Sequence, residues 1–194
     1  NWLTPQQAQQ GMADRYAKRK ALDLACHAFS AQVESAVDSP MVAAYRQFLE
    51  SADFWLEDYV RFHAFRHHHK LAPWTQWPAG LRDRDPAVCE PLATELTSAI
   101  TELRFRQFVF DCQWRELRHY ANQRGVLLFG DIPIFVHLES ADVWAHQQLF
   151  DLDEVGRPAT VTGVPPDYFS AEGQLWGNPQ YNWQLMRDTG FTWW

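Results

Sequence analysis

Asp131 is the first residue that could do chemistry, because of what precedes it. The apolar run 126–129 (VLLF) is bounded by Gly125 and Gly130, which is typical of a strand buried on both faces, as in a parallel sheet. Pro133 ends the run, since proline cannot donate to a sheet ladder. An acidic side chain at the carboxyl end of such a strand lies where α/β folds place their chemistry. Asp131 could therefore bind a substrate hydroxyl; the alternative is an aspartate that caps its own turn.

Trp176 is the second candidate, because its neighbours are amides and glycines. It lies between Gln174 and Asn178, with Gly173 and Gly177 close by, and glycine permits close approach of the backbone to a ligand. A flat indole beside amide groups suits a sugar, whose C–H face the ring covers while the amides bind the hydroxyls. The alternative is a tryptophan of the core.

A third candidate group is Asp167, Tyr168 and Phe169, which follow Pro165 and Pro166. Two prolines stiffen the backbone, and a stiff loop loses less conformational entropy when it binds a ligand. The alternative is a structural corner that buries the two rings.

Hydrolysis or transfer of a glycosidic bond usually needs two carboxyl groups that flank the bond, about 5 Å apart when configuration is retained. Spacing in the sequence does not select a pair from the candidates in the second half of the chain, which are Asp131, Asp142, Asp151, Asp153, Asp167 and Glu172.

A metal site is not indicated by the histidines. His63 and His67 are four residues apart, but the segment HAFRH lacks the glutamate of a HExxH zinc site. A solvated helix end explains these histidines better, and the chain carries no GxGxxG, phosphate-loop or GxSxG motif.

Composition limits the class of protein. The 194 residues are 46% hydrophobic, 15% aromatic and 21% charged, which favours a globular chain. The net charge of −7 argues against nucleic acid and anionic membranes as partners. Three well-separated cysteines without a CxxC pair are expected to be reduced thiols of a cytoplasmic protein.

Helices are predicted over most of the first 122 residues. Thr4 and Pro5 predict the start of a helix that runs to about Phe29. A second helix is expected after Pro40, and Ser51 predicts the cap of a third that ends near His69.

The stretch 73–91 holds four prolines and predicts a surface connection. Residues 87–122 again have a helical pattern, with Trp114 expected to pack in the core. The candidates for its core-facing side are Ile100, Leu103, Phe108, Trp114, Leu117 and Tyr120.

The second part of the chain predicts one core strand and an irregular excursion. A short helix capped by Ser140 is expected to end near Leu149, and residues 150–162 predict a β-hairpin with Gly156 in its turn. The expected organisation is a helical segment, 1–122, followed by a strand, hairpin and loop segment, 123–194. The succession of helix and strand favours the α/β class.

Four segments resemble one known family. They are GDIPIFV (130–136), SADVWA (140–145), GVPPDYFSAEGQLWGNPQYNW (163–183) and the closing GFTWW (190–194). These resemble the 4-α-glucanotransferases, or amylomaltases, of glycoside hydrolase family 77, and the similarity extends over essentially the whole chain.

The resemblance implies an incomplete (β/α)₈ TIM barrel of the α-amylase superfamily, rich in helices, with helical insertions and a hairpin and loop excursion after one barrel strand. It implies transfer of α-1,4-glucan segments between maltodextrins with retention of configuration, without a metal or organic cofactor. Carried over by motif, the residues that would bind the glucan are Asp131, Asp167, Tyr168, Phe169, Gln174 and Trp176.

One departure from the family pattern matters. The family's nucleophile lies in an Arg-x-Asp-His segment, and this sequence contains none. The first residue is not Met and the last two are tryptophans, so we expect a middle slice that carries substrate contacts but no catalytic carboxylate. Such a slice is expected to be inactive and to self-associate through its unpaired strand. The alternatives are a stand-alone carbohydrate-binding module and a helical interaction module.

Overall fold

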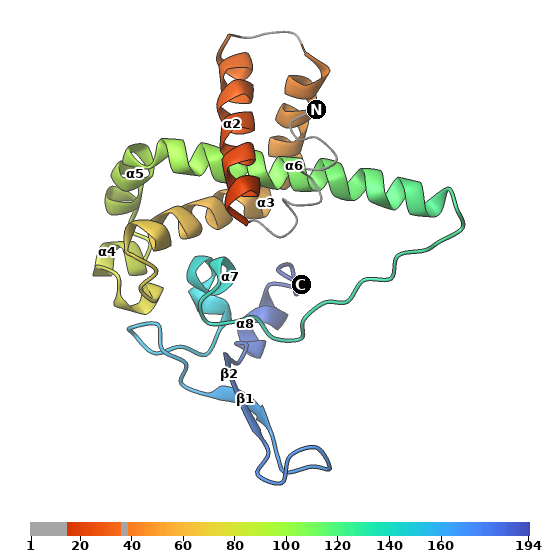
Figure 1. The fold of residues 1–194 in the computed structure, drawn as a ribbon. Coiled ribbons are helices and arrows are strands. Elements are labelled where there is room, and N and C mark those ends of the chain that lie inside the picture. The colour runs from red at the N-terminus through yellow and green to blue at the C-terminus, as the bar shows by residue number, and fades with distance from the viewer. Residues whose placement is uncertain (1–14, 36–38) are drawn as a thin grey trace. The chain divides into compact units, whose positions relative to one another are not determined.

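The structure, a computed structural model, describes residues 15–35 and 39–194. Its contacts divide the chain into two compact units that interleave along the sequence. Unit 1 combines residues up to Leu56 with Ser98–Leu128, and unit 2 combines Glu57–Thr97 with Phe129–Trp194. Figure 1 gives the elements in chain order by colour. The helix start predicted at Thr4 and Pro5 lies outside the described residues.

Unit 1 is built from helices. It contains α2 (Arg15–Glu34), the first part of α3 (Pro40–His68) and most of α6 (Thr97–Asn122). The core is aromatic: the ring of Phe29 meets Tyr45 edge-on at 5.2 Å between centroids and packs against Phe105 at 5.3 Å. Such ring pairs add to the apolar area that each ring removes from water.

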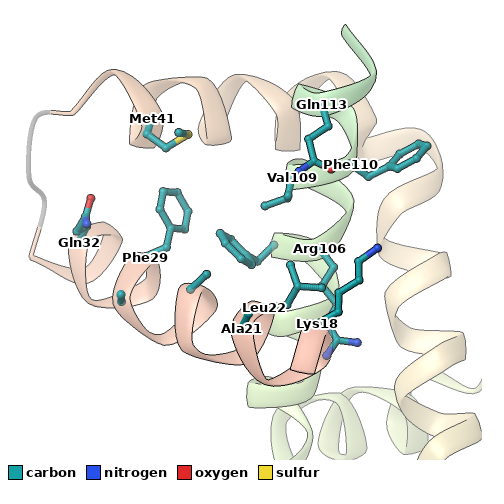
Figure 2. A pocket seen from close by; sticks show the side chains of 13 residues that line it. Lys18, Ala21, Leu22, Phe29, Gln32, Met41, Arg106, Val109, Phe110 and Gln113 are labelled. Carbon is teal, nitrogen blue, oxygen red and sulfur yellow. The ribbon is translucent and has the colours of Figure 1, made fainter. Parts of the chain in front are cut away.

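An open groove of about 700 Å³ lies between these helices (Figure 2). Its walls are mainly apolar, with Phe29 and Phe105 at the base and Met41 and Phe110 toward solvent. Arg106 lines one end and donates to Asp23 at 2.9 Å. Unit 1 therefore leaves part of its apolar helix surface uncovered.

The break predicted at Ser51 is wrong, because α3 runs without interruption from Pro40 to His68. The Ser51 hydroxyl donates to the carbonyl oxygen of Phe48 at 3.0 Å. Serine can bond back to the preceding turn inside a helix as readily as it caps one, so the residue type alone does not mark a boundary.

The prediction that Trp114, Leu117 and Tyr120 face the core is also wrong. Their exposed fractions are 44%, 53% and 56%, whereas Ile100 and Phe108 of the same helix are buried. The first half of α6 packs against its unit and the second half does not, although the helical pattern continues through both.

Residues 73–91 of unit 2 form short helices rather than a surface connection, so that prediction is corrected. Trp74 is fully buried and Trp77 is 4% exposed. Pro73, Pro78 and Pro86 lie at the starts of elements, where a missing N–H costs little, and Pro91 lies inside α5. These elements are the 3-10 helix η1 (Trp74–Gln76), α4 (Ala79–Arg82) and α5 (Pro86–Glu95).

Trp144 is the centre of the unit 2 core. It belongs to α7 (Ala141–Ala145), whose start is capped as predicted by Ser140, which accepts from the Val143 N–H at 3.2 Å. The Trp144 indole donates to the Leu81 carbonyl oxygen at 3.0 Å. The guanidinium of Arg84 lies 4.8 Å from its ring. A 3-10 helix η2 (Gln147–Leu149) and α8 (Trp183–Asp188) complete the helices of this unit.

The described residues contain one sheet, an antiparallel hairpin of β1 (Val161–Val164) and β2 (Gln174–Pro179). The hairpin predicted over 150–162 is present in part, as a turn whose two arms are joined by backbone hydrogen bonds but form no regular strands. Gly156 lies there with φ +79°, and a single bridge joins Leu152 to Pro158.

The buried strand predicted at 126–129 is wrong for this chain. These residues are neither helix nor strand, and Leu127 and Phe129 are 85% and 102% exposed. A parallel strand exists only when neighbouring strands satisfy its backbone groups. No such neighbour occurs among residues 15–35 and 39–194. The helix-rich character predicted from the sequence is confirmed.

None of the helices in the described ranges has the length and hydrophobicity of a transmembrane span. Within the same ranges no group of three or more His, Cys, Asp or Glu side chains is placed to bind a metal. Cys26, Cys89 and Cys112 are free thiols, and the first two are buried.

Candidate functional site

The hairpin β1–β2 carries most of the residues that the sequence singles out. In Figure 1 it extends away from α7 and α8 of its own unit. Gly163 pairs with Leu175, and Val164 pairs with Gln174. A side chain at Gly173 would place its Cβ 2.5 Å from the Val164 carbonyl oxygen. Because Gly173 has no side chain, the backbones of the two arms of the hairpin can approach each other this closely.

The tip of the hairpin is fixed by Asp167. One carboxylate oxygen of Asp167 accepts from the N–H of Phe169 at 2.9 Å and from the N–H of Ser170 at 2.8 Å. The Asp167 N–H in turn donates to the Ser170 carbonyl oxygen at 2.9 Å. An aspartate that bonds to the backbone two and three residues ahead closes a turn. The Asp167 side chain thus orders the segment that carries the two rings.

Tyr168 and Phe169 are presented to solvent by this turn. Their exposed fractions are 97% and 87%, and their rings meet edge-on at 5.6 Å. The alternative of a corner that buries these rings is wrong for this structure. Exposed rings on an ordered turn can pack against an apolar ligand face without a large loss of backbone entropy.

Trp176 and Gln174 form a pair on β2. Side chains two residues apart on a strand share a face, and the Trp176 indole N–H donates to the Gln174 side-chain oxygen at 3.0 Å. Trp176 is 50% exposed, so it is not a core tryptophan. The hydrogen bond orients a half-exposed indole beside an amide group.

Asp131 is exposed, and one of its carboxylate oxygens accepts from the adjacent Ile132 N–H at 2.8 Å. This local bond matches the alternative reading of a turn aspartate. The other oxygen of the carboxylate can still accept from a hydroxyl.

Three of the other candidate carboxylates also make hydrogen bonds within the chain. Asp151 accepts from the Thr160 hydroxyl at 2.6 Å, and Asp153 accepts from the N–H groups of Val155 and Arg157; Asp167 makes the turn already described. These contacts give each of the three carboxylates a structural role in the chain.

Sequence reasoning missed two residues that connect the site. Phe135 lies 6.5 Å from Trp176 and stacks on Tyr181 at 5.9 Å with an interplanar angle of 16°. The Tyr181 hydroxyl donates to the Ile134 carbonyl oxygen at 3.0 Å. No local pattern indicated these contacts, because the partners are 41–47 positions apart. The only available signal was that both residues fall inside the segments that resemble one family.

The chain is similar to known proteins over most of its length. The sequence profile described as 4-alpha-glucanotransferase matches residues 8–194. A 4-alpha-glucanotransferase of Synechocystis is 41% identical over 178 residues, which are 91% of this chain and 34% of that protein. One from Thermus thermophilus is 44% identical over 151 residues, which are 78% of this chain and 30% of that protein.

A solved structure is similar as well. The amylomaltase from Streptococcus agalactiae in complex with acarbose matches with a TM-score of 0.79 and 31% identity, over 94% of this chain and 36% of that one. The chain therefore spans about a third of the length of the relatives that it matches. Since the family profile covers nearly the whole chain, this protein belongs to the 4-alpha-glucanotransferase family of glycoside hydrolases.

Proposed function

We propose that this chain is a glucan-binding part of a 4-α-glucanotransferase. Its ligand is an α-1,4-glucan, such as a maltodextrin. The observation that carries the proposal is Trp176, whose half-exposed indole is oriented by Gln174 on the hairpin. A pyranose ring packs on the indole face, and the exposed rings of Tyr168 and Phe169 offer further apolar contacts. The relative bound to acarbose supports a saccharide as ligand.

The reaction of the complete enzyme is proposed as a retaining double displacement. A carboxylate attacks the anomeric carbon while a carboxylic acid protonates the leaving oxygen, which departs with part of the donor glucan. The 4-hydroxyl of an acceptor glucan then displaces that carboxylate from the anomeric carbon and gives its proton to the conjugate base of the acid. The sequence has no Arg-x-Asp-His segment, and Asp151, Asp153 and Asp167 are engaged in turns. We therefore expect the 194-residue chain alone to bind glucan without cleaving it.

The run 126–129 is proposed as a strand of a (β/α)₈ barrel in the complete enzyme. The proposal is supported by its apolar composition and by the structural match to an amylomaltase. The exposure of Leu127 and Phe129 in this chain then reflects missing neighbours, since a parallel strand is normally covered on both faces.

The test is a fluorescence titration of the 194-residue chain with maltoheptaose. We expect quenching that saturates, and we expect Trp176→Ala to abolish it. Trp114→Ala is the matched control, because Trp114 is similarly exposed (44%) but lies on α6 of unit 1. Equal quenching in both variants would overturn the assignment of Trp176. In a parallel assay, glucose released from maltotriose by the chain alone would overturn the claim that cleavage needs other groups.

A stand-alone carbohydrate-binding module remains the second candidate, and the same exposed Trp176 favours it. It differs in one prediction. A binding module holds glucan equally well alone and within the complete protein, whereas part of a cleft binds more weakly alone.

A further inference from the structure

Tyr181 connects two segments of the site that are far apart in the sequence. It follows the end of β2 and is 4% exposed. Its hydroxyl donates to the carbonyl oxygen of Ile134 at 3.0 Å. Ile134 is three residues after Asp131, so this bond attaches the segment that carries Asp131 to the strand that carries Trp176.

Phe135 reinforces the connection. Its ring stacks on Tyr181 at 5.9 Å and lies 6.5 Å from Trp176 at an angle of 59°. The ring of Phe135 thus contacts both the buried tyrosine and the exposed indole. Phe135 is adjacent to Ile134, so the ring contacts of Phe135 and the hydrogen bond from the Tyr181 hydroxyl hold the same short segment of the chain.

We infer that Tyr181 is a positioning residue, which holds the Asp131 segment and the Trp176 indole in one surface so that a single glucan contacts both. The inference rests on the proposed function. Two groups that are already fixed relative to each other lose little conformational entropy when the ligand binds. The affinity for the ligand is therefore higher than it would be for two mobile groups. The ligand is accordingly a glucan long enough to stack on Trp176 with one unit and to offer a hydroxyl to Asp131 with another.

The hydroxyl of Tyr181 can be separated from its ring. The ring also packs on Phe150 at 5.3 Å and on Trp193 at 5.8 Å, which is a structural role. Burial raises the pKa of Tyr181, with the charge of Asp142 adding to the effect, so the hydroxyl remains a donor at neutral pH. Tyr181→Phe keeps every ring contact and removes only the bond to Ile134.

The experiment is a ¹H–¹⁵N NMR titration of the 194-residue chain with maltoheptaose. Two signals are followed: the indole N–H of Trp176 and the backbone N–H of Ile132, which bonds to the Asp131 carboxylate. In the wild-type chain both signals shift with one dissociation constant. In Tyr181→Phe the affinity read at Trp176 falls about fivefold, the effect of one hydrogen bond, and the Ile132 signal no longer follows the ligand.

Two variants complete the design. Phe135→Leu removes the ring that touches Trp176 while the Tyr181 hydroxyl remains, and it is expected to uncouple the two signals in the same way; it also serves if Tyr181→Phe does not fold. Tyr120→Phe is the control, because Tyr120 is an exposed tyrosine of α6 in unit 1. It should change neither signal.

The outcomes separate this inference from the proposed function. If the Trp176 indole does not respond to maltoheptaose in the wild-type chain, the proposed function fails. If Trp176 responds and Ile132 does not, glucan binding stands and the joint surface is wrong. If both respond in Tyr181→Phe as they do in the wild type, Tyr181 is not a positioning residue.

Discussion

The indole N–H of Trp176 donates to the side-chain oxygen of Gln174 at 3.0 Å, across one face of β2. The two side chains therefore act as a unit, in which the amide sets the orientation of the ring. Loss of either partner changes the surface that the hairpin offers to a ligand.

Gln174→Leu tests this relationship. The variant keeps the approximate size of the side chain and removes the acceptor, so the indole gains rotational freedom. We expect maltoheptaose to bind two- to fivefold more weakly, which is about 0.4–1 kcal/mol for one exposed hydrogen bond. Titration calorimetry measures the change. Gln184→Leu on the exposed side of α8 is the control, and an equal loss of affinity in both variants would contradict the pairing.

The turn at Asp167 gives a second prediction. Asp167→Asn keeps the oxygen that accepts from the Phe169 and Ser170 N–H groups, whereas Asp167→Ala removes it. We expect hydrogen exchange at those two amides to accelerate about fivefold in the alanine variant, from the loss of bonds worth about 1 kcal/mol. Unchanged exchange in Asp167→Ala would show that the turn does not depend on the carboxylate.

Gly156→Ala should destabilise unit 2. Gly156 has φ +79°, and an added Cβ would lie 2.3 Å from the Trp74 ring. The expected cost in the free energy of unfolding is about 2–4 kcal/mol, from backbone strain and overpacking together. Gly177→Ala is a matched control, since φ is +75° there and no atom lies within 4 Å of the added Cβ.

Urea denaturation compares the two glycine variants. Gly177→Ala should lower the free energy of unfolding only by the backbone strain of a positive φ, about 1–2 kcal/mol. The difference between the variants isolates the contact with Trp74. A cost at Gly156 no larger than at Gly177 would mean that Trp74 can move aside.

Acid should weaken unit 2 through His63. Burial lowers the pKa of His63 below its ordinary value of 6.5, and Arg66 and His67 lower it further. Below about pH 6.5 the unfolded chain binds a proton that the folded chain resists, so stability is complete above that pH and falls as the pH drops. Burial lowers the pKa of His69 as well, which adds in the same direction.

The free energy of unfolding in urea at pH 5.5 and 7.5 measures this effect. His63→Gln should reduce the loss of unfolding free energy between pH 7.5 and 5.5. His27→Gln, an exposed change on α2, should not. A loss that is the same in wild type and His63→Gln would assign the pH dependence to other groups.

Self-association of the chain is expected to depend on the exposed run 126–129. Phe129 is fully exposed, so Phe129→Glu removes apolar surface without loss of core packing. Light scattering at high concentration should show a lower mean mass for this variant than for the wild type. Phe54→Glu is the control, because Phe54 is also exposed (81%) but lies on the helix α3. A monodisperse wild-type monomer would contradict the prediction.

Local signals in the sequence predicted the features that depend on local contacts. Ser140 caps α7 and Gly156 occupies its turn, because both roles are set by neighbours within a few residues. The family segments also pointed to the hairpin residues Gln174 and Trp176 before any geometry was known.

Features that depend on distant residues were not predicted. The run 126–129 has the composition of a buried strand, but composition does not supply the strands that must flank it. Trp74 is buried, and its indole N–H donates to the carbonyl oxygen of Leu138 at 2.8 Å, 64 residues away. The proline-rich sequence around it indicated only turns. Tyr181 and Phe135 were missed for the same reason, since their contacts with Ile134 and Trp176 are long-range.

Intermolecular NOEs between acarbose and the aromatic protons of the 194-residue chain test most directly whether the hairpin binds the glucan. We predict NOEs from pyranose C–H protons to the Trp176 indole, since one sugar face should cover that ring. NOEs confined to other tryptophans, such as Trp114, or none at saturating acarbose, would contradict the claim that this hairpin binds the glucan.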